Sequence, residues 1–246
     1  MSKSTLDDLI KELRQAFEDE AGRSPGPDRK FHKHDDYLSY GLKVKDLRRV
    51  RKEFLSRFLE LPFEARLKLA AKLIAENIGE LGHTGIVLLT KSIENLSPQY
   101  FDYLDQVLDH FRSWGLVDHF CGDVIKPLLL KYPELVLELL EKWSESSNRW
   151  KRRASVVPFT RSIGESGQFT DEVLHLCNKL IWDPEDIVQK GVGWALKDNL
   201  RSSPDRILPY IKELRRKGVP STITLYAIRD LKGAERKEVL SIKKDA

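Results

Sequence analysis

Apolar residues recur every three or four positions through most of the 246-residue chain, and this period constrains the fold more than any other feature. Leu6, Ile10, Leu13 and Phe17 form the first stripe, which fits one face of an α-helix. Similar stripes follow at short intervals without the alternation typical of strands. We therefore expect an all-α protein with further helices over 47–58, 62–78, 82–93, 98–112, 115–131, 133–145, 148–163, 170–181, 185–201, 204–216 and 219–231.

The connections between these helices are short, and many place a proline at the next helix entry, as in "SPQY", "KYPE" and "SSPD". Successive helix pairs advance by roughly 35 to 45 residues, the spacing of stacked HEAT-like hairpins. A compact bundle is the alternative, but about a dozen such helices cannot all surround one core. We therefore expect a right-handed α-solenoid of HEAT-like repeats with a concave basic groove.

The segment "AGRSPGPDRKFHKHDD", residues 21–36, interrupts the period with two prolines and two glycines. It separates the first helix from the rest of the chain. We expect residues 1–36 to form an N-terminal helix and linker that pack on the solenoid. Residues 37–246 should form one continuous HEAT-like repeat domain.

Several classes of protein are excluded by composition. The first twenty residues lack the apolar core of a signal peptide, and no run approaches the roughly 18 apolar residues of a membrane span. The two cysteines, Cys121 and Cys177, have no second cysteine or histidine at ligand spacing. We expect a soluble intracellular protein with no metal, cofactor or membrane association.

Three blocks, residues 43–57, 146–164 and 205–221, carry the basic residues, although the net charge is only +4. The block 205–221 ends in a basic helical turn that complements the helix dipole whatever the function, and the block 146–164 contains no acidic residue. One such block alone is most simply a solvated helix face, whereas several along a groove favour the backbone of duplex DNA as partner. The candidate contacts of the first two blocks are Lys45, Arg48, Arg49, Lys52, Arg149, Lys151 and Arg152.

Trp194, in "QKGVGWALKD", lies away from the apolar stripe of its predicted helix and toward Lys190 and Lys197. These two lysines are further candidate DNA contacts. Gly191 and Gly193 flank the tryptophan, and glycine inside a helix costs about 1 kcal/mol relative to alanine. The two glycines indicate that something bulky approaches the backbone, either a ligand or a neighbouring repeat.

The stretch "FRSWGLVDHFCGD" places Trp114 four residues before Asp118, near a helix start predicted at Ser113 to Gly115. One helical turn separates the two side chains, so they share a face. A tryptophan face beside a carboxylate suits a cationic, planar or sugar-like group. The alternative is an acidic residue that only favours the helix start.

Together, "SWGLVDHFCGD", "NRWKRRASV" and "QKGVGWALKD" resemble, in order and spacing, motifs of the AlkD-like DNA alkylation repair family of HEAT-like alkylpurine DNA glycosylases. The resemblance extends from near Tyr40 to near Leu231. It implies that Trp114, Asp118, Arg153 and Trp194 surround the lesion. The chain departs from the family at Ser113 and Gly115.

The family's chemistry implies a monofunctional glycosylase that hydrolyses the N-glycosidic bond of 3-methyladenine or 7-methylguanine in duplex DNA. Asp118 would stabilise the oxocarbenium-like transition state and position water, the two tryptophans would face the base or sugar, and Arg153 would hold a phosphate. The resemblance also implies a monomer that acts on alkylated double-stranded DNA, in the cytoplasm or, in a eukaryote, the nucleus.

Two other functions fit the same sequence. A HEAT-like protein could recognise DNA structure without excising a base, or it could act as a scaffold for another protein. Base release from alkylated DNA separates the first alternative from a glycosylase. Salt-insensitive or absent binding to duplex DNA would favour the scaffold.

Overall fold

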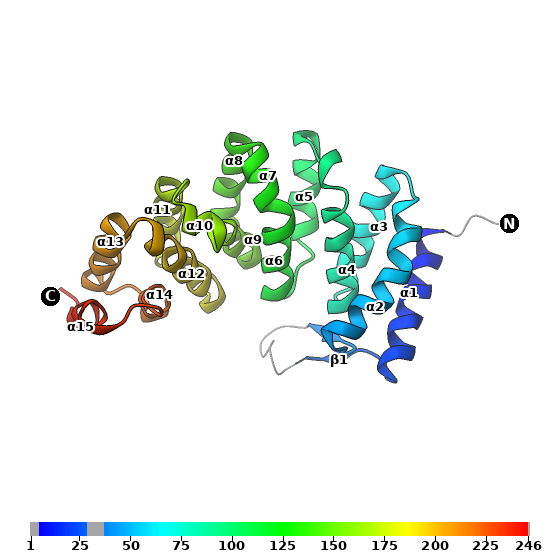
Figure 1. Cartoon of the computed structure of the whole chain (residues 1–246), viewed down its shortest axis with the longest axis horizontal. Helices are drawn as coiled ribbons and strands as arrows, with labels where there is room; N and C mark the ends of the chain where they lie inside the picture. The colour runs from blue at the N-terminus through cyan, green and yellow to red at the C-terminus, as the bar shows by residue number, and fades with distance from the viewer. Residues whose placement is uncertain (1–4, 29–36, 246) are drawn as a thin grey trace. The chain divides into compact units, whose positions relative to one another are not determined.

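The computed structural model describes residues 5–28 and 37–245, and most of these residues are helical (Figure 1). The predicted all-α class is therefore confirmed. The helices form two compact units, Met1–Pro127 and Leu128–Ala246. Linker residues 29–36 lie outside the described part of the chain. Among the described residues, no helix combines the length and hydrophobicity needed to cross a bilayer.

Unit 1 begins with a helix and a very short antiparallel hairpin, and then continues in helices. Its elements are α1 (Leu6–Ala21), β1 (Gly26–Pro27), β2 (Leu38–Ser39), α2 (Val44–Leu59), α3 (Phe63–Ala75), α4 (Gly79–Thr90), two 3₁₀ turns (Ile93–Asn95 and Pro98–Tyr100), α5 (Phe101–Leu108), α6 (Trp114–Phe120) and a π-helical turn (Cys121–Ile125). The boundary between the units falls inside α7 (Lys126–Lys131).

The acidic helix α1 packs against α2 and α3 and pairs its carboxylates with their basic residues. Arg57 lies 2.7 Å from Glu12, and Lys72 lies 2.8 Å from Asp7. Leu13 of α1 is completely buried in the core. The N-terminal helix is therefore an integral part of unit 1.

A buried carboxylate fixes the chain just before α2. Glu80, on α4, accepts hydrogen bonds from the Ser39 hydroxyl at 2.9 Å and from the backbone N–H groups of Tyr40, Gly41 and Leu42 at 3.1, 3.0 and 3.3 Å. These donors balance the cost of removing a charge from water. The bonds hold the start of α2 against α4.

Unit 2 consists of helices in two layers, which appear as an upper and a lower row in Figure 1. We call α8, α11 and α13 the α8 layer, and α9, α12 and α14 the α12 layer; the short α10 packs on α12. The elements are α8 (Pro133–Ser144), α9 (Arg149–Ala154), a 3₁₀ turn (Val157–Phe159), α10 (Ser162–Ser166), α11 (Thr170–Leu180), α12 (Asp186–Ser202), α13 (Pro204–Lys217), α14 (Ser221–Ala227) and α15 (Gly233–Ser241).

The core of unit 2 follows the predicted stripes. On α12, Val188, Val192, Ala195 and Leu196 are completely buried, and so is Trp143 on α8. Helix α12 contacts α9, α10, α11, α13 and α14. It is therefore the central element of its unit.

The single helix predicted over 148–163 is wrong, because the chain forms α9, a 3₁₀ turn and α10 instead. Pro158 lacks the N–H that an α-helix needs at that point. Arg161 then adopts φ 56° and ψ −132°, a conformation that costs a non-glycine residue on the order of 1–3 kcal/mol. The break turns α10 back onto α12.

Both cysteines are buried, Cys121 in unit 1 and Cys177 in unit 2. Burial raises the pKa of the Cys177 thiol. The reactive form of a cysteine is the thiolate, so Cys177 is held in its unreactive form.

Candidate functional site

Helix α6 begins where the sequence predicts. Ser113 has extended backbone geometry, and its hydroxyl accepts a hydrogen bond from the Leu116 N–H at 3.2 Å. This N-cap fixes Trp114 as the first helical residue. Trp114 is 37% exposed and Asp118, one turn later, is half-buried. The structure therefore brings these two residues together on one helical face.

The helix widens into a π-helical turn over Cys121–Ile125, three residues after Asp118. Turns of this kind are rare and frequently occur at functional sites. Gly122 lies one turn beyond Asp118, and a Cβ atom added there would meet no atom within 4 Å. The surface beside Asp118 is therefore open.

His119, the residue after Asp118 in the sequence, belongs to a histidine pair that the sequence did not predict. His119 Nε2 lies 3.3 Å from Asp123 Oδ2, and His119 Nδ1 lies 2.9 Å from His83 Nδ1 on α4. Burial and Arg51 lower the pKa of His119, against the opposite effect of Asp123. The neutral ring is thus favoured. Nothing local in the sequence pairs His83 with a residue on another helix.

Arg153, in unit 2, is fixed against the start of α12. The side chain is 4% exposed, and Nη1 donates to the Ile187 carbonyl at 2.6 Å. A Cβ atom added to Gly191 would lie 3.4 Å from Cγ and Nη1 of Arg153, so this glycine leaves room for the arginine. The predicted phosphate contact of Arg153 stays a prediction.

Trp194 is half-buried on α12, and the Arg161 guanidinium lies over its ring at 5.3 Å from the centroid. Gly193, beside it, accommodates α14. An added Cβ atom would lie 2.6 Å from Tyr226 Cβ and 2.8 Å from the Ile223 carbonyl oxygen. Close packing of neighbouring helices therefore accounts for both glycines of the "QKGVGW" motif.

The first basic block places three cations on the surface of α2. Lys45, Arg48 and Lys52 are exposed and form no ion pair with any residue of the described segments. Arg49 differs, because Glu20 of α1 pairs with it and raises the pKa of its guanidinium. The acidic helix thus neutralises Arg49 and leaves the other three cations available.

The second basic block is used largely within the protein. Arg152 binds both carboxylate oxygens of Asp183, at 2.5 and 3.3 Å, and donates to two loop carbonyls. Arg149 pairs with Glu185 at 3.3 Å, and Lys151 is 8% exposed. These side chains join α9 to the chain around the start of α12, rather than forming the solvated row expected from the sequence.

The two lysines near Trp194 also differ from each other. Lys190 is exposed and pairs with Asp186 at 2.5 Å. Lys197 is 7% exposed and pairs with Asp198 at 2.7 Å and Asp230 at 3.4 Å. This burial does not support the predicted DNA contact by Lys197, and its pair with Asp230 joins α12 to the chain after α14.

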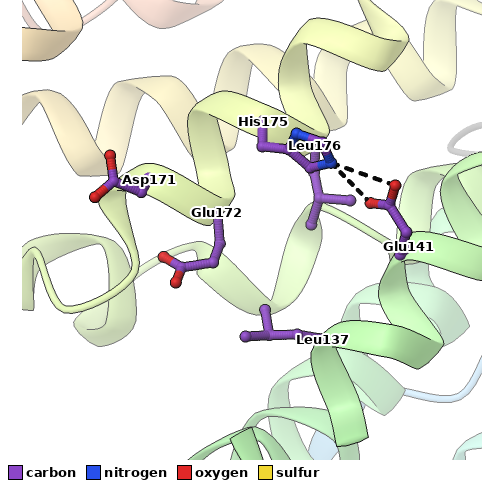
Figure 2. A pocket seen from close by; sticks show the side chains of 6 residues that line it. All are labelled: Leu137, Glu141, Asp171, Glu172, His175 and Leu176. Atoms are coloured by element: carbon purple, nitrogen blue, oxygen red, sulfur yellow. Dashed lines mark hydrogen bonds and ion pairs between the residues drawn. The ribbon is translucent and has the colours of Figure 1, made fainter. Parts of the chain in front are cut away.

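A shallow pocket of about 250 Å³ lies between α8 and α11 (Figure 2). None of the site residues described above lines it. Its carboxylates make it unsuited to phosphate, and Glu141 accepts a hydrogen bond from His175 at 3.1 Å. No cluster of metal-ligating side chains occurs in residues 5–28 and 37–245. The pocket is lined by Leu137, Glu141, Asp171, Glu172, His175 and Leu176.

Comparisons with known proteins agree with the sequence motifs. A family model described as DNA alkylation repair enzyme matches residues 10–231. No curated protein sequence matches the chain.

Two solved structures share the fold. A predicted DNA alkylation repair enzyme from Enterococcus faecalis has a TM-score of 0.62 at 14% identity, over 92% of this chain and 96% of that one. The alkylpurine DNA glycosylase AlkC from Pseudomonas fluorescens, bound to DNA containing an abasic site analogue, has a TM-score of 0.53 at 18% identity. That match covers 92% of this chain and 62% of AlkC.

Proposed function

Because the chain belongs to the DNA alkylation repair enzyme family, we propose that it is a monofunctional DNA glycosylase that releases cationic alkylated purines, such as 3-methyladenine and 7-methylguanine, from duplex DNA. The observation that carries the proposal is the open face of α6, where Trp114 and Asp118 lie one turn apart. We further propose that the protein works as a monomer in the compartment that holds the DNA.

Hydrolysis of the glycosidic bond of a cationic purine requires a negatively charged group near the sugar more than it requires a general acid. An alkylated purine already carries a positive charge, so its glycosidic bond is weakened before the enzyme acts. As the bond breaks, the charge moves to the sugar. The Asp118 carboxylate, one turn after Trp114 on α6, would stabilise that charge and hold the attacking water.

The tryptophans would supply faces to the cationic base or the deoxyribose. Trp114 is exposed enough to contact a ligand, and Trp194 presents its indole beside Arg161. Attraction between a cation and an indole face contributes about 0.5–2 kcal/mol, depending on desolvation. Such contacts would favour cationic lesions over normal bases.

The cations of α2 would hold the DNA backbone. Lys45, Arg48 and Lys52 are exposed and free of ion pairs with described residues. Each phosphate that a protein neutralises adds about 0.9 to the slope of log affinity against log salt. These three would therefore contribute a slope of roughly 3.

The test is base release from methylated duplex DNA by the wild type and Asp118→Asn. We expect the variant to lose about a hundredfold or more in rate, on the order of 3 kcal/mol, while it still binds DNA. The matched control is Asp123→Asn, the same change at the exposed partner of His119. It should stay within a few fold of the wild type.

Equal release by Asp118→Asn and the wild type would contradict the role of Asp118. Salt-dependent binding by a wild type that releases no base would instead identify a protein that recognises DNA without excision.

A further inference from the structure

Arg161 occupies the strained position between the 3₁₀ turn and α10, with φ 56° and ψ −132°. Strain of this kind persists only where surrounding contacts impose it, and it is concentrated at functional sites. The contact here is with Asp198, on α12. The Arg161 N–H donates to Asp198 Oδ2 at 2.7 Å, and Asp198 is 2% exposed.

The strained backbone projects an exposed side chain toward Trp194. The guanidinium lies 5.3 Å from the centroid of the indole ring. Stacking on an aromatic face orients a guanidinium but leaves its N–H edge available. That edge is suited to a bidentate contact with a phosphate or carboxylate.

Arg161 also differs from Arg201 and Arg206, two other exposed arginines of unit 2, in whether a carboxylate pairs with its guanidinium. Arg201 pairs with Glu165 and Asp230, and Arg206 pairs with Asp171. Arg161 forms no ion pair with any residue that the structure describes. Arg161 is therefore a cation beside Trp194 that no described carboxylate neutralises, and it can bind an incoming anion.

We propose that Arg161 binds a DNA backbone phosphate next to the nucleotide that Trp194 contacts, and that Asp198 is the residue that positions it. This inference rests on the proposed function, because that function supplies DNA as the ligand. A phosphodiester matches the guanidinium in charge and in the spacing of its two free oxygens. The arginine would fix the register of the duplex relative to the Trp194 ring.

The test compares Arg161→Ala with Arg206→Ala, which removes the same charge from an exposed arginine of the α8 layer. Affinity is measured against salt concentration on two duplexes, one undamaged and one with an abasic-site analogue. Arg161→Ala should weaken binding about tenfold and lower the salt slope by about 0.9 on both duplexes. Arg206→Ala should change neither quantity, because Asp171 already neutralises that cation.

Two more variants separate binding from folding. Arg161→Lys keeps the charge but not the planar fork, so it should retain the salt slope and lose part of the affinity. Arg161→Gly relieves the positive φ. It should bind DNA as weakly as Arg161→Ala, with a melting temperature no lower than that of the wild type.

An unchanged salt slope in Arg161→Ala would overturn the proposal. An equal loss in Arg206→Ala would also overturn it, because the effect would then be one of net charge. Melting temperatures that fall together with affinity in all three Arg161 variants would assign the residue to folding instead.

Base release by the wild type is measured on the same preparations. If the wild type releases the base and Arg161→Ala changes neither DNA affinity nor the salt slope, the inference about Arg161 is refuted and the proposed glycosylase activity is supported. If the wild type binds DNA in a salt-dependent way but releases no base, the proposed glycosylase activity is refuted. The salt slopes of the wild type and Arg161→Ala still test the role of Arg161. The absence of salt-dependent binding to DNA refutes both.

Discussion

The two layers of unit 2 use charge differently. In the α8 layer, carboxylates of one helix pair with cations of the next at the surface. Glu141 of α8 pairs with Lys179 of α11, and Asp171 of α11 pairs with Arg206 of α13. Exposed pairs of this kind contribute little to stability and are screened by salt.

The α12 layer has exposed pairs too, such as Arg201 with Glu165, but it also contains pairs that are buried. Lys197 and Asp198 have side chains 8% and 2% exposed, and Arg152 and Asp183 have side chains 15% and 3% exposed. A buried charge that loses its partner is strongly destabilising. The buried pairs of the α12 layer therefore form a fixed frame, whereas the exposed charges of the α8 layer can be replaced. Arg153 and Trp194 lie on helices of this layer, and Arg161 is bonded to it through Asp198.

The largest expected effect comes from breaking a buried pair of the frame. Asp198→Ala removes the nearer partner of Lys197 and the acceptor of the Arg161 N–H. We expect it to lower the free energy of unfolding by about 3–4 kcal/mol in urea titrations. Asp171→Ala, the matched change in the α8 layer, should leave the unfolding midpoint unchanged.

A second substitution shows whether the loss in Asp198→Ala comes from the stranded charge. Adding Lys197→Met should recover part of the lost stability, because an apolar side chain needs no partner. Equal stability of Asp198→Ala and Asp171→Ala would remove the distinction between the layers.

A smaller effect should follow from crowding the contact between α12 and α14. Gly193→Ala places a methyl group 2.8 Å from the Ile223 carbonyl oxygen and 2.6 Å from Tyr226 Cβ. We expect a loss of about 2 kcal/mol, measured by thermal and urea unfolding. The control is Gly122→Ala, where the added methyl meets no atom within 4 Å. There alanine should be neutral or stabilising by up to about 1 kcal/mol.

The smallest expected effect is a pH dependence confined to the α8 layer. Although burial acts in the opposite direction, Lys179 and His175 hold the pKa of Glu141 below its ordinary value of 4.5. A depressed folded pKa stabilises the protein above pH 4.5, and the stabilisation disappears as the pH falls through the folded pKa.

Thermal unfolding of Glu141→Gln beside the wild type checks this dependence. The wild type should melt slightly higher at about pH 6, and the gap should be smaller at a pH below 4.5. A gap that is the same at both pH values would show that the Glu141 pairs add no stability through its charge.

The sequence predicted the features that depend on local patterns. The apolar period identifies most helices of both units, and Ser113 begins α6 as expected. It missed α15, where Val239 is the one buried residue of the helix. A helix with so little apolar surface leaves almost no period to detect.

The parts that could not be predicted depend on partners distant in the sequence. The local sequence predicts that Arg152 is an unpaired cation, because its carboxylate partner Asp183 lies 31 residues away in the chain. The turn at Arg161 depends on Asp198, 37 residues later. Charge patterning therefore identifies which blocks are basic, but it does not separate the cations that hold helices together from those that stay exposed.

The burial of both native cysteines makes the protein suitable for site-specific labelling. Thiol reagents react with accessible thiolates, and neither Cys121 nor Cys177 presents one at the surface. A cysteine introduced at an exposed position of α2 and another at an exposed position of α13 could each carry a fluorophore without removal of the native residues. The distance between such labels would report directly on whether the two units move when DNA is added.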